Sequence, residues 1–342
     1  MQNFIFYQKE NFLAFTKTRQ GENKLGQTIQ AVSNVKKWKQ ELKSSSSKFV
    51  LVGIPEDIGV KANYGVGGAH TAWPSFLNAF FNIQQNRFLD GKSIMLLGYF
   101  DFSSLHLKAQ NKSIEYVRDL VSEIDKEVTA IVQEIVACGK VPIIIGGGHN
   151  NAYGNIKGAA LGLHSLGKVK AKSINVLNLD AHADLRALEG RHSGNAFSYA
   201  MEDGFLKKYG MLGLHESYIT AEMDKKISQN KQLKAIFFED IFIRKITGYE
   251  EAIEQLLTFT KDTYTGIEVD LDVIEQVLSS ALSPTGLQTI DARRFIHLAA
   301  KRGKVAYLHI CEGAAQLDNG ISSSTTGKLI AYLVSDFIKA IK

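Results

Sequence analysis

Short apolar runs alternate with longer amphipathic segments over most of this sequence. Eight of these runs lack strict apolar–polar alternation, which is typical of strands covered on both faces of a parallel sheet. They are residues 49–54, 94–98, 141–145, 174–179, 209–214, 235–238, 265–270 and 305–310. Segments with helical spacing lie between or after them, as at residues 113–138, 249–260, 292–302 and 326–341. The alternation predicts an α/β fold of three layers, in which helices flank an eight-stranded parallel sheet.

The first 48 residues are polar and helix-prone, unlike the segments that follow. They end in four consecutive serines, Ser44 to Ser47, and then Lys48, and such a serine run is typical of a linker. We therefore expect residues 1–48 to form a helical extension and linker, packed on or loosely tied to one main domain of residues 49–342. A chain of 342 residues can form a single α/β domain of this kind.

The charge balance argues against a nucleic-acid-binding protein. Because 40 Lys and Arg stand against 35 Asp and Glu, the formal net charge is only +5, and no basic stripe is interleaved with aromatic residues. No run approaches the roughly 18 apolar residues of a membrane helix, and residues 1–9 lack the apolar stretch of a signal peptide. Cys138 and Cys311 form no Cys-x-x-Cys pair, which suits a reducing compartment. We expect a cytoplasmic protein without a membrane or nucleic-acid partner.

Three of the apolar runs end in potential metal ligands. They lead into Gly146-Gly147-Gly148-His149-Asn150, Asp180-Ala181-His182-Ala183-Asp184 and Asp270-Leu271-Asp272. In an open parallel sheet, ligands bind outside the carboxyl ends of the strands, which lie at one edge. We therefore expect two histidines and four aspartates to meet at this edge.

The residue types and their spacing favour a metal centre. Alternate residues at a strand end share a face, so Asp180, His182 and Asp184 can point to one side. Four carboxylates so close together would repel one another without cations, and two divalent ions supply the matching positive charge. Mixed imidazole and carboxylate ligands suit manganese, with zinc, cobalt or iron as alternatives. Taken singly, each motif has a plainer interpretation, such as a tight turn, a structural histidine or a helix N-cap.

With these motifs the sequence resembles the arginase, agmatinase and formimidoylglutamase family over nearly the whole chain after residue 49. The matching segments are residues 146–150, 178–186, 193–195, 269–272 and 309–313, with residues 53–57 and 65–69 upstream. The resemblance implies an arginase-like fold, two manganese ions per chain, and a homo-oligomer, either a trimer or a hexamer.

The resemblance also implies a role for each matching residue. One ion would be held by His149, Asp180, Asp184 and Asp270. The other would be held by Asp180, His182, Asp270 and Asp272, so that two aspartates bridge the ions. A hydroxide between the ions would be the nucleophile. The implied catalytic residues are Asp184 and Glu312, and the implied substrate-binding residues are Arg186, Ser193, Asn195 and Glu312.

Two of these positions bear on the substrate. Glu312 would face a planar, cationic amidine or guanidine, which pairs well with a carboxylate; apart from the resemblance it would be a solvated charge at a strand end. Arg186 stands where arginases have an Asn that contacts the substrate's α-carboxylate, and an Arg is a stronger partner for a carboxylate. Formimidoylglutamases have similar Asp-Leu-Arg sequences, whereas agmatine has no carboxylate to bind. The alternative is that Arg186 is a surface residue or pairs with Glu189.

One departure from the family weakens the interpretation as an arginase. Two residues after the Ser-Gly-Asn segment, arginases have a histidine thought to shuttle protons, and this chain has Phe197. His192 or His215 are possible substitutes. We therefore expect hydrolysis of N-formimidoyl-L-glutamate to glutamate and formamide, a step of histidine degradation. The alternatives are a ureohydrolase acting on arginine or another guanidino acid, and a non-catalytic family member that acts as a binding subunit.

Overall fold

The computed structural model describes residues 2–341 and contains one mixed sheet of ten strands. In sheet order the strands are β1 (Phe4–Phe6), β4 (Ile94–Phe100), β3 (Phe49–Gly53), β5 (Val141–Ile145), β10 (Val305–Cys311), β9 (Thr265–Asp270), β6 (Ile174–Leu179), β7 (Leu206–Leu214) and β8 (Leu233–Phe237). The short strand β2 (Gln30–Ala31) pairs with β4. Strands β3 to β10 are mutually parallel. These are the eight predicted strands, so the parallel part of the sheet is confirmed, and β1 and β2 extend the sheet beyond the prediction.

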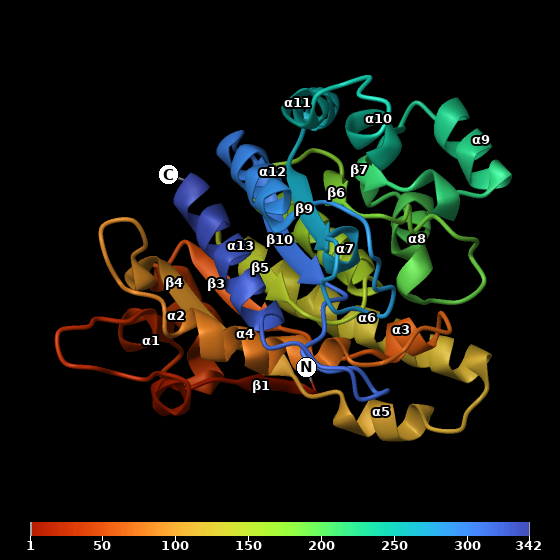
Figure 1. Ribbon diagram of the computed structural model, residues 1–342. Coiled ribbons are helices and arrows are strands. Elements are labelled where there is room, and N and C mark those ends of the chain that lie inside the picture. Colours follow the sequence, from red (N-terminus) through yellow and green to blue (C-terminus); the bar gives the residue numbers. More distant parts are fainter. Residues whose placement is uncertain (1, 342) are drawn as a thin grey trace.

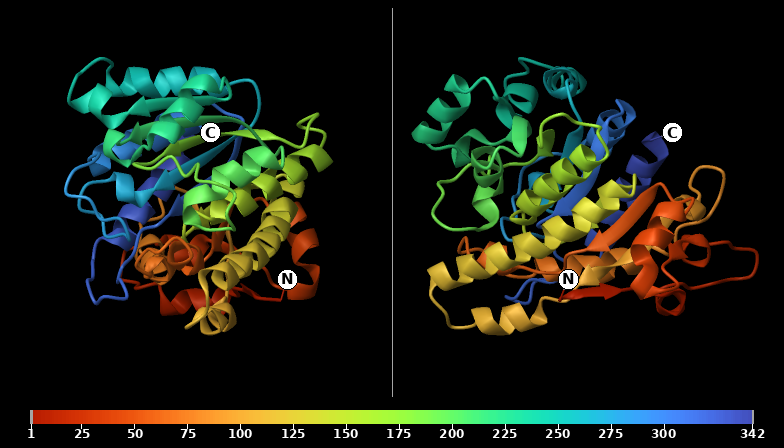
Figure 2. Two further views of the ribbon diagram at one scale, coloured as in Figure 1. Left: turned by 90° about the vertical axis from the view of Figure 1, so that its right-hand side faces the viewer. Right: turned by 180° about the vertical axis from the view of Figure 1, so that it is seen from behind.

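Helices cover both faces of the sheet, as the two opposite views show (Figure 1, Figure 2). One face packs against α4 (Ala72–Phe80), α10 (Phe238–Phe242), α11 (Tyr249–Thr260), α12 (Thr289–Lys301) and α13 (Thr326–Ala340). The other face packs against α2 (Trp38–Ser44), α3 (Ile58–Lys61), α5 (Ser103–Ala109), α6 (Ile114–Ala137), α7 (Asn151–Ser165), α8 (Ala196–Glu202) and α9 (Ala221–Gln229). The short helix α1 (Leu25–Thr28) contacts the turn Gly91–Ser93, which directly precedes β4.

The continuous apolar runs follow from these two helical layers. Within β3, Phe49 and Leu51 join the hydrophobic core on one face, whereas Val50 and Val52 join the core on the other. Since side chains alternate along a strand, a strand covered on both faces needs an apolar residue at every position. This is why the eight parallel strands stand out in the sequence.

The residues before Phe49 contribute two strands to the sheet edge. β1 pairs antiparallel with β4, where Phe4 lies opposite Phe100 and Phe6 opposite Gly98. A Cβ on Gly98 would lie 2.0 Å from the Ile5 carbonyl oxygen, so glycine at this position is what allows the two strands to pair. Within the serine run, the carbonyls of Ser45 and Ser47 each accept a hydrogen bond of 2.8 Å from the Lys140 ammonium, which ties this segment to the residues that follow α6.

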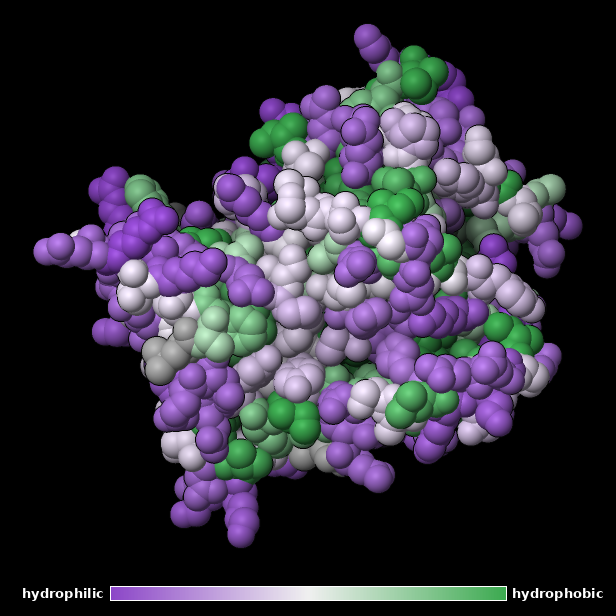
Figure 3. All heavy atoms as spheres, turned by 60° about the horizontal axis from the view of Figure 1, so that its bottom comes forward, coloured by the Kyte–Doolittle hydropathy of each residue, from purple (hydrophilic) through white to green (hydrophobic). Residues whose placement is uncertain are grey.

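No helix among the described residues combines the length and the apolar character needed to cross a bilayer. On the face shown in Figure 3, hydrophobic side chains form separate small patches between hydrophilic ones. Scattered apolar residues of this kind are ordinary on protein surfaces.

The order of the strands positions the candidate site. β5, β10, β9 and β6 are consecutive neighbours in the middle of the sheet. His149 follows β5, Glu312 follows β10, Asp270 ends β9, and Asp180 follows β6. All four therefore come from carboxyl ends of adjacent parallel strands, which lie at one edge.

Candidate metal centre

A glycine turn after β5 brings His149 to the sheet edge. Gly146 and Gly147 have φ angles of +89° and +79°, in the region that favours glycine. The buried carboxylate of Glu56 fixes the turn, since it accepts hydrogen bonds from the Gly148 N–H at 3.1 Å and from the Asn151 side chain at 2.6 Å. The triplet therefore serves as a tight turn whose shape sets the position of the following histidine.

Three carboxylates surround the imidazole of His149. Its Nδ1 lies 2.9 Å from Asp184 Oδ2, 3.2 Å from Asp180 Oδ2 and 3.3 Å from Asp270 Oδ2. The histidine is 1% exposed and Asp180 is fully buried, so solvent does not separate these groups. One ligand atom from each of the four residues lies within 4.8 Å of the others, which is a grouping that could hold a metal ion.

A second group shares Asp180 with the first. His182 Nδ1 lies 3.2 Å from Asp272 Oδ2 and 3.7 Å from Asp180 Oδ1. Asp180 thus turns one carboxylate oxygen toward each histidine. Asp270 belongs to the group around His149 and not to the group around His182, and its Oδ1 accepts a hydrogen bond of 2.9 Å from the Asp272 N–H.

The electrostatics of the cluster suit divalent cations. Burial and the charge of neighbouring carboxylates raise the pKa of Asp270 well above its usual value, because like charges resist joint ionisation. Burial opposes protonation of His182, but the pKa of this histidine is raised by Asp272 and Asp180. The clustered carboxylates therefore favour positive charge nearby, which divalent metal ions would supply.

Polar atoms without hydrogen-bond partners provide an independent test of the fit. His149 Nδ1 has three carboxylate oxygens within 3.3 Å yet makes no well-directed hydrogen bond to any of them. The buried Oδ1 of Asp272 also lacks a partner. Buried polar atoms are rarely left unpaired, and atoms that converge on a point without pairing are the arrangement that a bound cation needs. The donor set therefore fits metal binding at this cluster.

Glu312 lies beside the cluster on a strained turn. Its Oε1 accepts a hydrogen bond of 2.7 Å from the His149 N–H. Burial and the charge of Asp272 raise the pKa of the Glu312 carboxyl to about 8, although the hydrogen bond from His149 acts in the opposite direction. Glu312 and Asp184 have φ angles of +60° and +48°. Non-glycine residues rarely adopt this conformation, and such strain is concentrated at functional sites.

A cavity of about 150 Å³ opens onto the cluster. Three of the expected substrate-binding residues, Arg186, Ser193 and Glu312, line it. Four of the ligand candidates also line it: His182, Asp184, Asp270 and Asp272. Asn195 does not line it, because its side chain is used within the loop. The amide donates to the Ala187 and Gly190 carbonyls and accepts from Arg191.

The whole parallel part of the sheet, with this cluster at its edge, matches a known family. Residues 47–338 match the family model described as the arginase family. The chain belongs to the arginase family.

Individual relatives agree with this assignment. The formimidoylglutamase of Clostridium tetani is 26% identical over 348 residues, which cover 97% of this chain and 93% of that protein. The structure of the Bacillus subtilis formimidoylglutamase has a TM-score of 0.73 at 18% identity and covers 95% of this chain and 94% of its own. A Trypanosoma cruzi formiminoglutamase structure with Mn²⁺ has a TM-score of 0.67 at 20% identity, over 88% of this chain and 97% of that one. The two structural matches establish the arginase-like fold.

Several residues around the ligand cluster carry no signal in the sequence that identifies them. Asn63 lines the cavity and its amide donates to the Ser193 hydroxyl at 3.2 Å, and the Tyr218 ring stacks on His182 at 4.6 Å. Arg191 is 4% exposed and links Asp125 on α6 to the backbone carbonyl of Asn150. Each comes from a loop or a helix outside the strand-end motifs, so no spacing rule identified it.

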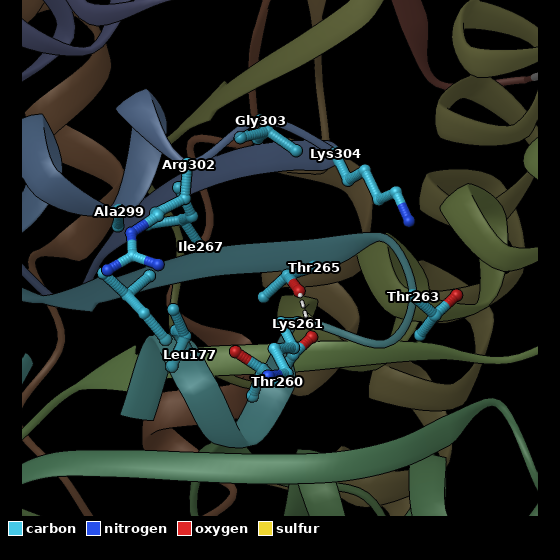
Figure 4. Close-up of a pocket in the computed structure, with 12 residues that line it drawn as sticks. Leu177, Thr260, Lys261, Thr263, Thr265, Ile267, Ala299, Arg302, Gly303 and Lys304 are labelled. Atoms are coloured by element: carbon cyan, nitrogen blue, oxygen red, sulfur yellow. Dashed lines mark hydrogen bonds between the residues drawn. The ribbon is translucent and has the colours of Figure 1, made fainter. Parts of the chain in front are cut away.

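A separate cavity of about 230 Å³ lies at the opposite edge of the sheet (Figure 4). It lies at the amino ends of β9 and β10, where Thr265 donates to the Thr260 carbonyl, and its rim carries Lys261, Arg302 and Lys304. None of the candidate ligands lines it. Basic residues near the carboxyl ends of α11 and α12 also complement the helix dipoles, so their presence does not require a ligand.

Proposed function

We propose that this arginase-family protein is a hydrolase with two divalent metal ions that cleaves the formimino C–N bond of N-formimidoyl-L-glutamate. The products would be glutamate and formamide. The observation that carries the proposal is the convergence of six imidazole and carboxylate side chains beside Glu312 and Arg186. The six are His149, Asp180, His182, Asp184, Asp270 and Asp272. The names of the relatives give the proposal its substrate.

We assign one ion to the group around His149 and the other to the group around His182. Asp180 and Asp270 would contribute to holding both ions, since Asp180 turns one oxygen toward each histidine and Asp270 Oδ2 faces His149. We propose manganese because the ligand types suit it and because the Trypanosoma cruzi relative was solved with Mn²⁺. When bound, a pair of such ions lowers the pKa of a shared water enough to provide a nucleophile at neutral pH.

The side chains of this chain would hold the substrate against that centre. Glu312 has one carboxylate oxygen committed to the His149 N–H, which leaves the other free to accept a hydrogen bond from a cationic formimidoyl group. A cation in the cavity would favour the ionised form of Glu312, whose pKa is raised by burial. Glu312 thus orients the amidine carbon toward the cluster.

Among residues 2–341, the Arg186 side chain has no ion-pair partner, so it can bind a carboxylate of the substrate. Arg186 lines the metal cavity and also a neighbouring cavity of about 400 Å³. Glu189, its alternative partner, instead lies 3.3 Å from Arg118 and 3.2 Å from His192. Gly194 makes room for the arginine, since a Cβ there would lie 3.0 Å from Arg186 Cδ. A substrate with two carboxylates and a cationic head suits this arrangement of charges.

The position of Phe197 disfavours a proton shuttle of the arginase type. The ring is fully buried and packs edge-on against His149, with centroids 5.1 Å apart. The two substitutes considered from the sequence are engaged elsewhere, because His192 faces Glu189 and His215 stacks on Phe238. Neither lines the metal cavity. This favours an amidine substrate over arginine, although Glu312 could also pair with a guanidinium.

A substrate panel tests the proposal. Manganese-loaded protein is assayed with formimidoylglutamate, arginine, agmatine and a guanidino acid, and formamide, urea and ammonia are all measured. We expect formamide from formimidoylglutamate as the dominant product. Urea from a guanidino compound would favour the ureohydrolase alternative, and no turnover of any compound by a metal-loaded sample would favour a non-catalytic binding subunit.

A further inference from the structure

The second ring nitrogen of His149 faces away from the ligand cluster. Nδ1 lies among the three aspartates, whereas Nε2 is buried and has no hydrogen-bond partner. The carboxylate oxygen Oε2 of Glu268 lies 3.6 Å from it, which is slightly beyond hydrogen-bond distance. A histidine that binds a metal through Nδ1 carries its proton on Nε2, and this N–H commonly donates to a carboxylate or carbonyl that orients the ring.

Glu268 is held in place by two donors from the neighbouring strand. It lies on β9 two positions before Asp270, so both side chains project from the same face of the sheet. On β10, the Tyr307 hydroxyl donates to Oε1 at 2.6 Å and His309 Nδ1 contacts Oε2 at 2.6 Å. His309 Nε2 in turn lies 3.3 Å from the Gly146 carbonyl, in the turn that carries His149.

The surroundings of Glu268 are shaped to keep this group in the core. Glu268 and His309 are fully buried, and burying a carboxylate is costly unless it is well paired. The Tyr307 ring fits only because residue 266 is glycine, since a Cβ there would lie 2.4 Å from the ring. Two strands can be joined by apolar side chains without this cost, so a buried acid directly behind a candidate metal ligand calls for a role at that ligand.

We propose that Glu268 is a positioning residue, which accepts the Nε2–H of His149 and so fixes the imidazole that binds the first metal ion. Tyr307 and His309 hold the carboxylate at the required place. The inference rests on the proposed metal centre but not on the identity of the substrate. It predicts that the metal-loaded protein closes the gap between His149 Nε2 and Glu268 Oε2 to about 2.7–3.2 Å.

Manganese binding provides a test that does not depend on activity. Titration of metal-free protein, followed by the EPR signal of free Mn²⁺, gives the affinity of each site. We expect Glu268→Gln to weaken binding of at least one ion by about 10–100-fold, while far-UV circular dichroism stays that of the wild type. Glu268→Asp should also weaken binding, because the shorter side chain withdraws the carboxylate; wild-type affinity in this variant would show that charge alone acts and would overturn the proposal.

Two control variants separate positioning from general loss of stability. Tyr307→Phe removes a donor to Oε1 but leaves Oε2 facing His149, so its effect on affinity should be clearly smaller than that of Glu268→Gln. Asn175→Ala removes a buried side chain on β6 whose amide bonds the Thr260 carbonyl, far from the cluster. If Asn175→Ala lost as much Mn²⁺ affinity as Glu268→Gln, the lower affinity would result from a general loss of protein stability, and the proposal would be overturned.

A crystal structure of the manganese-loaded wild type tests the contact between His149 and Glu268 even if Glu268→Gln does not fold. A His149 Nε2 that remains beyond hydrogen-bond distance of Glu268, or that donates to another acceptor, contradicts the proposal. Wild-type protein that binds no manganese would instead remove the proposed metal centre itself. The two failures are therefore distinguishable.

Discussion

The Oδ2 atom of Asp184 lies 2.9 Å from Nδ1 of His149, and the Asp184 backbone adopts a φ angle of +48° to place it there. A left-handed conformation costs a non-glycine residue roughly 1–2 kcal/mol. The chain therefore accepts both backbone strain and repulsion between carboxylates at this position. A bound cation would offset both costs, since it turns the repulsive cluster into a ligand sphere.

Replacing Asp184 should therefore weaken metal binding and stabilise the metal-free protein. We expect Asp184→Gly to raise the free energy of unfolding of the metal-free protein by about 1 kcal/mol, because glycine accepts the positive φ and one carboxylate is removed. Its affinity for at least one Mn²⁺ should fall. Urea unfolding and manganese titration measure the two effects, and a variant that is less stable and binds manganese normally would refute this account of the strain.

Loss of a bridging carboxylate should abolish activity without unfolding the protein. Asp180→Asn and Asp270→Asn each remove a negative charge from the cluster but keep the shape of the side chain. We expect no detectable formamide release and weaker binding of at least one ion, with a normal circular dichroism spectrum. Asp262→Asn is the matched control, because Asp262 pairs with Lys207 at the surface. Wild-type turnover by Asp270→Asn would disprove its assignment as a bridge.

Arg186 should select substrates that carry a carboxylate. A charge-assisted hydrogen bond contributes roughly 1.5–3 kcal/mol, which corresponds to about ten- to a hundredfold in binding. Arg186→Ala should raise KM for formimidoylglutamate by about this factor and change kcat less, the pattern of lost uniform binding. Arg186→Lys should recover only part of the loss, because an ammonium cannot form the planar fork of a guanidinium.

Arg118→Ala serves as the control for Arg186. Arg118 is a nearby arginine that pairs with Glu189 and does not line the metal cavity. Its KM should stay close to that of the wild type. If KM were unchanged in Arg186→Ala, or if an uncharged formimidoyl amine were hydrolysed equally well, the carboxylate would be bound by other residues.

A pH-dependent contribution to stability should come from His70, away from the metal cluster. Its Nδ1 lies 2.7 Å from the buried Asp57, and this hydrogen bond raises the pKa of His70 above its usual value. A raised histidine pKa stabilises the fold below the unfolded pKa of about 6.5, and the benefit is lost as pH rises through the folded pKa. Lys61 and His106 also face Asp57. Both residues are present in the wild type and in the His70→Gln variant, so they do not account for a difference between the two.

We therefore expect the wild type to exceed His70→Gln in stability at about pH 6 and to lose much of this advantage by about pH 9. Urea unfolding midpoints of the two metal-free proteins at both pH values provide the measurement. A difference that is the same at both pH values would show that the contact acts through packing or a neutral hydrogen bond.

The parallel strands, and the convergence of the six candidate side chains at one edge, could be predicted from the sequence for physical reasons. A strand covered on both faces needs apolar residues throughout, so runs such as residues 141–145 and 174–179 are conspicuous. Polar residues at their ends are equally conspicuous, and the parallel arrangement places them at one edge. In contrast, β1 and β2 have only three and two residues, too few to show any periodicity.

Residues that act through tertiary contacts left a weaker signal. Spacing along the chain does not reveal that β5, β10, β9 and β6 are neighbours in the sheet. It also does not reveal that the Asn195 side chain bonds within its own loop. Both features depend on how the chain packs. Glu268 and His309 did leave a trace, since each interrupts an apolar run that forms a buried strand. A charged residue in such a strand needs a buried partner, and this requirement is the rule that would have found the pair.

The central claim, that bound metal ions are required for hydrolysis of formimidoylglutamate, is tested most directly by titrating metal-free protein with Mn²⁺ while formamide release is measured. The account predicts no release without metal and a plateau at about two ions per chain. Full activity of the metal-free protein, or no formamide from a sample that has bound manganese, would contradict it.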